Sequence, residues 1–78
     1  MQIGKITQVM GPVVDVHFDE MPLPYIQTAL QVDNHGKKVV MEVMQHIGID
    51  TVRCIMLSPS EGLQKDMPVL STGMGIEI

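Results

Sequence analysis

The stretch "GKITQVMGPVVDVHF", residues 4–18, holds two β-strand patterns separated by a glycine and a proline. Glycine accepts positive φ and proline cannot donate to a sheet ladder, so Gly11-Pro12 ends the first strand, which we expect at residues 3–9. The second strand, at residues 13–18, alternates between two faces, with Val14, Val16 and Phe18 on one and Val13, Asp15 and His17 on the other. The stretch predicts β-structure with one buried side.

Similar short patterns follow, each bounded by turn residues. Two prolines in residues 19–25 exclude a helix or a central strand there, and Asn34-His35-Gly36 is typical of a hairpin turn. The capping-box pattern Ser58–Glu61 has no amphipathic run behind it, so residues 58–62 are interpreted as a turn. We therefore expect further strands at residues 29–33, 38–47, 51–57 and 67–72. In the longest of these strands, one predicted face carries Val39, Met41, Val43 and Ile47. The opposite face carries Glu42 and His46.

Six short strands in 78 residues, with frequent turns, predict an all-β fold. A small closed six-stranded antiparallel barrel fits better than an open sheet, because closure removes the exposed edge strands. The length allows one domain, residues 1–78.

Composition restricts the class of partner. The formal net charge is −4, and the only aromatic residues are one phenylalanine and one tyrosine. Nucleic-acid binders usually carry a basic face, and single-strand binders add stacking rings, so we expect no nucleic-acid partner. A single cysteine indicates a reducing compartment. Because no signal segment or long apolar run is present, the chain is predicted to be cytosolic, with membrane association only through partners.

Residues 45–54, "QHIGIDTVRC", combine many side chains that enzymes use. A nucleophilic site would pair Cys54 with His46 and an orienting group. In a hairpin that turns at residues 48–50, His46 lies opposite residue 52 or so, whereas Cys54 lies further along, beside residue 44. Strand alternation also separates Cys54 from Arg53. We therefore predict no catalytic residues, and a buried, unreactive Cys54.

Phosphate and metal sites are not predicted either. Residues 31–38, "QVDNHGKK", approach a phosphate-binding loop, but they lack its first glycine, its hydroxyl residue and a following helix. "GMGIEI", residues 73–78, fails as a dinucleotide motif because it ends in isoleucine. A metal site needs clustered ligands. His17 and His46 are expected on outward faces and His35 in a turn, so we expect no cofactor-binding or metal-binding residues.

Apolar residues also occur on the faces assigned to the outside. Val13, Val40 and Met44 stand there among Asp15, Glu42 and His46. Several exposed apolar residues on neighbouring strands suggest a partner protein.

Taken together, several phrases resemble one family: "GKITQVMGPVVDVHF" (4–18), "ALQV" (29–32), "EVMQHIGIDTVRCI" (42–55), "EGL" (61–63) and "VLSTG" (69–73). In order and spacing they are similar to the N-terminal barrel of the beta, catalytic subunit of F-type ATP synthase. The alpha subunit and the V-type and flagellar relatives match these phrases less well. The sequence departs from the family at Lys65-Asp66, where a glycine often follows the basic residue, and within residues 55–62, which carry Met56 and Pro59.

The resemblance implies a structural role. In the family, barrels of alternating alpha and beta subunits form a crown that holds a hexamer together. The complex makes ATP from ADP and phosphate with a transmembrane ion gradient, and it is bound to the cytoplasmic face of the cell membrane. The nucleotide site, with ATP or ADP and magnesium, belongs to a following domain. The resemblance therefore implies a fragment of a bacterial subunit, truncated after residue 78, with no catalytic or cofactor-binding residue of its own and no direct membrane contact.

The implied partners are alpha subunits on both sides. Such contacts are heterologous, so we expect the isolated chain to be a monomer or a weak dimer. Two other readings remain open. One is a free-standing barrel that binds a ligand or nucleic acid, as translation-factor and OB-type barrels do. The other is an independent enzyme that uses Cys54 or His46.

Overall fold

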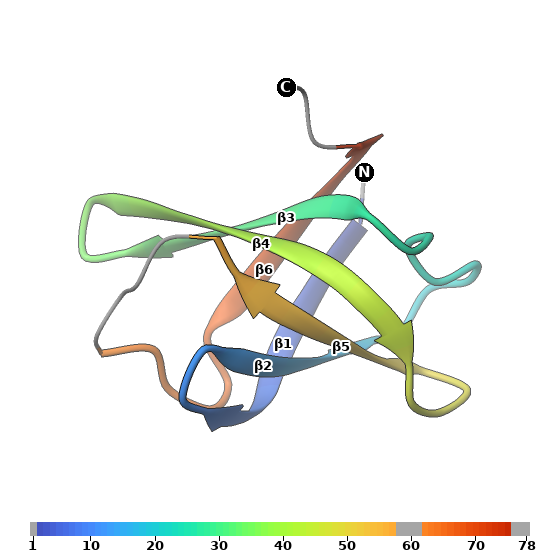
Figure 1. Ribbon diagram of the computed structural model, residues 1–78, viewed down its shortest axis with the longest axis horizontal. Coiled ribbons are helices and arrows are strands. Elements are labelled where there is room, and N and C mark those ends of the chain that lie inside the picture. The colour runs from blue at the N-terminus through green and yellow to red at the C-terminus, as the bar shows by residue number, and fades with distance from the viewer. Residues whose placement is uncertain (1, 58–61, 76–78) are drawn as a thin grey trace.

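The computed structural model describes the backbone of residues 2–57 and 62–75, and side chains as far as residue 71. Every regular element in these ranges is a strand, which confirms the all-β prediction (Figure 1). The strands are β1 (Gln2–Met10), β2 (Val13–Phe18), β3 (Thr28–Asn34), β4 (Lys37–His46), β5 (Thr51–Met56) and β6 (Pro68–Gly75). Five of them match the predicted ranges to within about one residue at each end, and β6 continues beyond the predicted residue 72.

The strands form a closed antiparallel barrel, as predicted, and their order around it is β1-β2-β5-β4-β3-β6. Short turns connect β1 to β2, β3 to β4 and β4 to β5, and these pairs are neighbours in the sheet. The last strand closes the barrel, because β6 pairs with both β1 and β3. None of the six strands is therefore left with an unpaired edge.

The predicted inward faces of β2 and β4 point into the barrel, except at Ile47. Val14, Val16 and Phe18 are fully buried, and β4 contributes Val39, Met41 and Val43. Removing a side chain of this size from water stabilises the fold by about 1.5–3 kcal/mol. The rest of the core is formed by Ile6, Leu30, Val32, Val52, Cys54, Leu63 and Val69.

The prediction that Ile47 shares the inward face of β4 is wrong. The pairing of β4 with β5 shifts between Val43 and Gln45, so Met44 has no partner of its own and forms a β-bulge. An extra residue moves the side chains after it to the opposite face. Beyond the bulge the strand ends at His46, and Ile47 is 38% exposed.

The hairpin between β3 and β4 turns at the predicted residues. His35 and Gly36 have φ angles of 53° and 89°. Positive φ at both central residues is the requirement of a type I′ turn, whose twist matches that of the flanking strands. The carboxylate of Asp33 accepts a hydrogen bond of 2.9 Å from the amide of Gly36.

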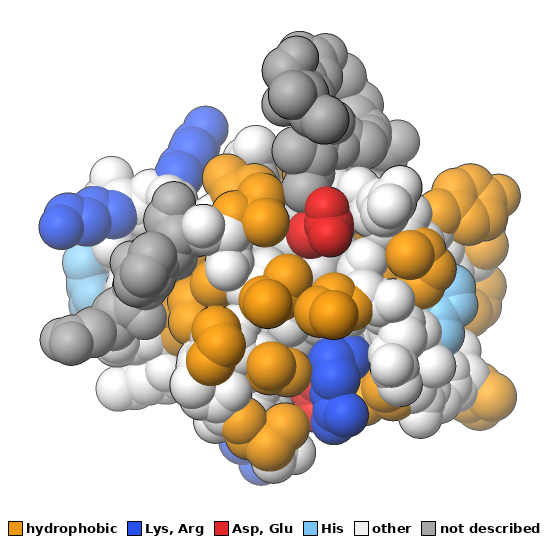
Figure 2. Space-filling view, viewed as in Figure 1, with side chains coloured by type: hydrophobic (Ala, Val, Ile, Leu, Met, Phe, Trp, Pro, Cys, Tyr) orange, Lys and Arg blue, Asp and Glu red, His pale blue; other side chains and the backbone are white. Residues whose placement is uncertain are grey.

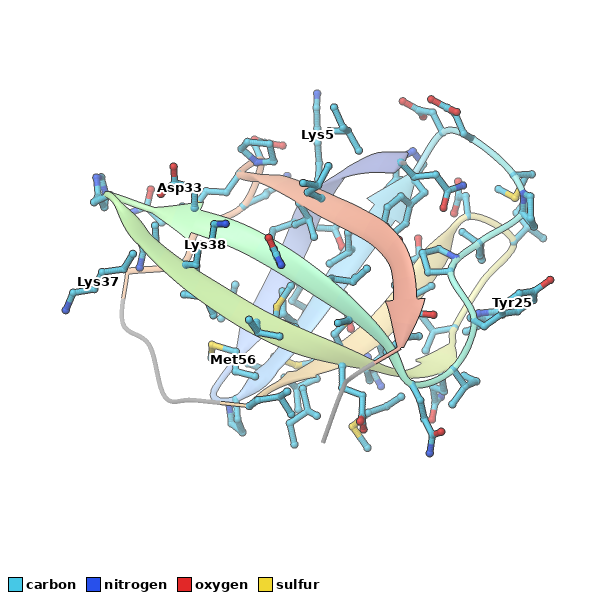
Figure 3. All side chains as sticks on the ribbon, turned by 90° about the horizontal axis from the view of Figure 1, so that it is seen from above. Lys5, Tyr25, Asp33, Lys37, Lys38 and Met56 are labelled. Atoms are coloured by element: carbon cyan, nitrogen blue, oxygen red, sulfur yellow. The ribbon has the colours of Figure 1, made fainter. Side chains whose placement is uncertain are left out.

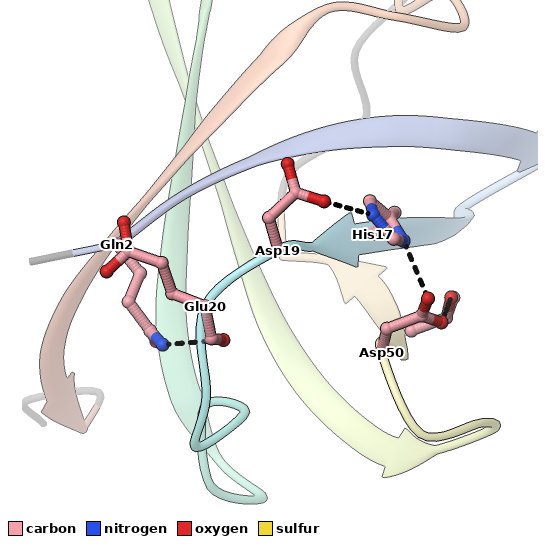
Figure 4. A network of polar contacts seen from close by, with 6 residues as sticks. Gln2, His17, Asp19, Glu20 and Asp50 are labelled. Atoms are coloured by element: carbon pink, nitrogen blue, oxygen red, sulfur yellow. Dashed lines mark hydrogen bonds and ion pairs between the residues drawn. The ribbon is translucent and has the colours of Figure 1, made fainter.

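Side-chain contacts connect the loops at the end of the barrel where β1 begins (Figure 4). His17 contacts two carboxylates, with Nε2 2.8 Å from Asp19 and Nδ1 3.3 Å from Asp50. The side-chain amide of Gln2 donates to the carbonyl oxygens of Glu20 and Pro22. A hollow of about 350 Å³ lies between the loop at residues 20–25 and strands β1 and β6. The predicted turn at residues 58–62 falls mostly outside the described residues.

Candidate functional site

The segment at residues 45–54 forms the end of β4, a turn and most of β5. His46 lies opposite Val52, as predicted. Cys54 lies opposite Val43 rather than residue 44, because the bulge at Met44 shifts the register. The ring of His46 donates from Nε2 to the carbonyl oxygen of Pro24, at 2.7 Å. His46 therefore stabilises the loop before β3, and the hairpin keeps it apart from Cys54.

Cys54 is fully buried, as predicted. Burial, and to a smaller extent the negative charge of Asp15, raise the pKa of Cys54 to about 12. A nucleophilic cysteine needs the opposite, an exposed thiol with a lowered pKa. The side chain is part of the hydrophobic core.

The segment that resembles a phosphate-binding loop contains the β3–β4 hairpin. A strand follows Gly36 where a phosphate loop needs a helix N-terminus. The amide of Gly36 already donates to Asp33. This geometry does not present the cradle of backbone amides that such loops use. The second glycine-rich segment lies in β6 as far as Gly75, and residues 76–78 lie outside the described residues.

The three histidines lie on separate elements, as predicted: His17 on β2, His35 in a hairpin turn and His46 at the end of β4. Across residues 2–57 and 62–75, no three potential ligands come close enough together to hold a metal ion. In the same ranges, no helix is long and apolar enough to cross a membrane.

An ion pair connects the outer sides of β2 and β5. Asp15 and Arg53 are direct cross-strand partners, and Arg53 donates from Nε to Oδ1 at 2.9 Å and from Nη2 to Oδ2 at 3.2 Å. The side chain of Asp15 is 5% exposed and that of Arg53 is 38% exposed. The hydrogen bond and the charge of Asp15 raise the pKa of Arg53 above its already high value. Arg53 covers the carboxylate and keeps further N–H groups for an acceptor from outside.

Sequence reasoning placed Asp15 on the outside but missed its burial and its pairing. The available signal was an aspartate in the middle of one outward face and the chain's only arginine in the middle of another. The sequence does not show which strands are neighbours. Because β2 lies next to β5, across 38 residues of chain, the two side chains meet.

The ion pair borders a patch of apolar side chains, which begins at the next outward positions of β2 and β5 (Figure 2). Its own row continues in the polar residues Gln8 on β1 and Gln45 on β4. Met10, Val13 and Ile55 are neighbours across β1, β2 and β5, and Glu42 continues the row on β4. Val40 lies two residues before Glu42, and Leu57 two residues after Ile55. These two residues are also neighbours, because the amide of Leu57 donates to the carbonyl oxygen of Val40 at 3.0 Å. Val13, Val40 and Ile55 are half-buried, whereas Met10 is 42% and Leu57 48% exposed.

We call Met10, Val13, Val40, Ile55 and Leu57, with Arg53 and Glu42, the β5 face. Methionine and arginine are both enriched in protein–protein interfaces, and here an apolar patch with Met10 is bordered by Arg53. The outward positions of Val13 and Val40 are confirmed, and Met44, which is 50% exposed, lies further along β4. The β5 face is the candidate functional site, a surface that can bind another protein.

A comparison with known families gives one match. The family described as "ATP synthase alpha/beta family, beta-barrel domain" matches residues 6–73. The match includes all of β2 to β5 and most of β1 and β6.

Proposed function

The chain belongs to the ATP synthase alpha/beta family, as its β-barrel domain, and from that premise we propose that it is an assembly module between neighbouring subunits. It joins barrels of the same family into a ring and carries out no chemistry itself. The observation that carries this proposal is the β5 face, an apolar patch bordered by the half-exposed Arg53. The closed barrel of six strands gives such a surface a rigid support.

Within the family, we assign the chain to the beta, catalytic type of subunit. Support comes from "GPVVDV" (11–16) and "QHIGIDTVR" (45–53), which resemble the beta type more than the alpha type. The neighbours on both sides are then alpha subunits. The complex makes ATP with a transmembrane ion gradient at the cytoplasmic face of a bacterial membrane. ATP, ADP and magnesium bind to another domain of the parent subunit.

The free-standing binding module is less well supported. Phe18 is fully buried in the core, and of the chain's two aromatic residues only Tyr25, which is 76% exposed, presents its ring to solvent. Sequence-tolerant binding of single strands uses several stacked bases on a positively charged groove. One exposed ring on a chain of net charge −4 does not provide that arrangement.

The test measures binding of the chain to the alpha subunit by sedimentation velocity. Leu57→Asp places a charge on the β5 face, and Ile49→Asp makes the same change at a residue that is 89% exposed in the β4–β5 turn. We expect Leu57→Asp to weaken binding at least tenfold, about 1.4 kcal/mol, and Ile49→Asp to leave it unchanged. If the unmodified chain shows no affinity for the alpha subunit, the proposed function is wrong.

A further inference from the structure

Two segments at the end of the barrel where β1 begins carry most of the large apolar side chains that the described residues expose. One is the loop between β2 and β3, residues 19–27, and the other is the end of β4 with the following turn, residues 44–50. Six of the nine exposed large apolar side chains belong to these segments: Met21, Tyr25, Ile26, Met44, Ile47 and Ile49. We call the two segments together the loop end.

Hydrogen bonds hold the two segments of the loop end side by side. The ring of His46 donates to the carbonyl oxygen of Pro24 at 2.7 Å, and the amide of Gln27 donates to the carbonyl oxygen of Val43 at 2.7 Å. Figure 2 shows apolar side chains gathered at the right-hand end of the molecule, where Figure 1 has these two segments. The exposed apolar side chains therefore form one surface, the kind of patch that marks an interaction site.

The loop end is also acidic. It carries the carboxylates of Asp19, Glu20 and Asp50, and no lysine or arginine occurs in either segment. Asp19 and Asp50 contact His17. The carboxylate of Glu20 is exposed, and within the described part of the chain it has no hydrogen bond or ion pair. One carboxylate of the loop end is therefore available to a cation from outside.

The hollow of about 350 Å³ opens within this surface. Met21, Leu23 and Tyr25 line it with apolar atoms, and Glu20 lines it as well. A lysine or arginine side chain fits both kinds of lining, because its stem is apolar and its head is cationic. Met21 and Tyr25 belong to the exposed apolar surface too, so the hollow and that surface form one site.

The loop end is separate from the β5 face. Met10 ends β1, Val13 begins β2 and Leu57 follows β5, so these residues of the β5 face lie toward the other end of the barrel. The loop end, by contrast, contains the residues that follow β2 and precede β5. A partner at the loop end is therefore additional to the subunit contact of the proposed function.

We propose that the loop end binds a basic amphipathic segment of a partner protein, which places one lysine or arginine side chain in the hollow and apolar side chains against Tyr25 and its neighbours. Charge complementarity selects this occupant. Nucleic acids and anionic membrane surfaces carry the same sign of charge as the loop end and are repelled by it.

A second copy of this chain is a poorer occupant. Figure 3 shows Lys37 and Lys38 at the opposite end of the barrel from Tyr25, so a head-to-tail contact would bring opposite charges together. The hairpin that carries these lysines, residues 33–38, contains no large apolar side chain, however, and would leave the apolar surface of the loop end uncovered.

Two synthetic peptides test the inference with the whole chain. The first contains leucine and arginine, and the second is identical except that glutamate replaces every arginine. Binding is located by NMR spectroscopy of the isotope-labelled chain and quantified by fluorescence titration. Glu20→Gln removes the carboxylate from the hollow, and Glu42→Gln is the matched control, because it makes the same change of charge on the β5 face.

We expect the basic peptide to shift the amide resonances of residues 19–27 and 44–50, and the acidic peptide to shift none of them. Glu20→Gln should weaken binding of the basic peptide about fivefold, the upper range for an ion pair at a surface, and Glu42→Gln should leave it unchanged. Tyr25→Ser should weaken binding by a similar factor. Leu57→Ser, at a residue of the β5 face that is 48% exposed, should not.

Four outcomes contradict the inference. Equal weakening by Glu20→Gln and Glu42→Gln would show that the peptide responds only to net charge. Resonance shifts confined to the β5 face would overturn the site and leave the proposed function standing. No binding of the basic peptide, or equal binding of the acidic one, would exclude a basic occupant. Shifts of the loop-end resonances with chain concentration alone would identify a second copy as the occupant.

Discussion

At the scale of single residues, Cys54 shows how burial controls reactivity. With a pKa of about 12, roughly one thiol in ten thousand is ionised at pH 8. We expect a thiol reagent to label the native chain many times more slowly than the urea-unfolded chain at the same pH. Labelling of the native protein at the unfolded rate would contradict this. Cys54→Ser should lower the free energy of unfolding by about 1–3 kcal/mol, because it buries a hydroxyl.

The same thiol makes stability depend on pH. Its pKa rises from 9.0 to about 12 on folding, so below pH 9 both states are protonated and the contribution of Cys54 is fully present. Between pH 9 and 12 the unfolded chain loses the proton first, and the contribution is lost as pH rises. Urea denaturation should therefore show a steeper loss of stability above pH 9 for the natural chain than for Cys54→Ala. If the stabilities of the two proteins fell equally with pH, Cys54 would not contribute to the pH dependence.

At Gly4 the surrounding atoms leave no room for a side chain. A Cβ atom at this position would lie 2.6 Å from the backbone oxygen of His17 and 2.9 Å from atoms of Val16 and Phe18. Gly4→Ala should destabilise the barrel by about 1–3 kcal/mol, since the neighbouring backbone must move. Gly48→Ala is the matched control, because its Cβ would meet no atom within 4 Å. Equal urea midpoints for the two variants would show that β2 adjusts freely.

At the scale of elements, the turn before β6 explains one departure from the family. Asp66 has a φ of 73°, a conformation in which glycine is favoured and most side chains are strained. Its amide donates to the carbonyl oxygen of Ile6 at 2.7 Å and connects the turn to β1. Asp66 therefore holds a backbone conformation that favours glycine, the residue that the resemblance gives for this position.

Two substitutions at Asp66 separate conformation from side chain. Asp66→Gly should leave stability unchanged or raise it by up to about 1 kcal/mol, whereas Asp66→Ala should lower it by about 1 kcal/mol. Thermal unfolding of the two variants provides the measurement. An alanine variant as stable as the glycine variant would show that positive φ is not required at this turn.

At the scale of the whole molecule, nucleotide binding is expected to be absent. The segment closest to a phosphate-binding loop is a hairpin, and its Gly36 amide is bonded to Asp33. Isothermal titration with magnesium-ATP should therefore show no binding at micromolar concentrations. Thermal unfolding is an independent check, because a ligand at 100 times its Kd would stabilise the chain by about 2.7 kcal/mol. Micromolar affinity would refute the assignment of nucleotide binding to another domain.

Self-association is also expected to be weak. The barrel measures 28 × 28 × 19 Å, so its largest flank presents roughly 780 Å², just under the ~800 Å² per partner of a typical stable interface, and two copies of net charge −4 repel each other. We expect a monomer or weak dimer in sedimentation velocity at micromolar concentration. A stable homohexamer would mean that the ring contacts form between identical chains, and the expectation of heterologous contacts with alpha subunits would be wrong.

Local sequence pattern was enough to predict the strands, the inward residues of β2 and most of those of β4, and the barrel class. Alternation of apolar residues acts over a few positions, and glycine and proline act locally, so Val14, Val16 and Phe18 were placed correctly from their spacing. Only the tertiary structure decided which strands are neighbours. The Asp15–Arg53 pair, the bulge that turns Ile47 outward and the row of apolar residues across β1, β2 and β5 all depend on strand order and register. These arise from contacts between residues far apart in the chain, which local pattern does not specify.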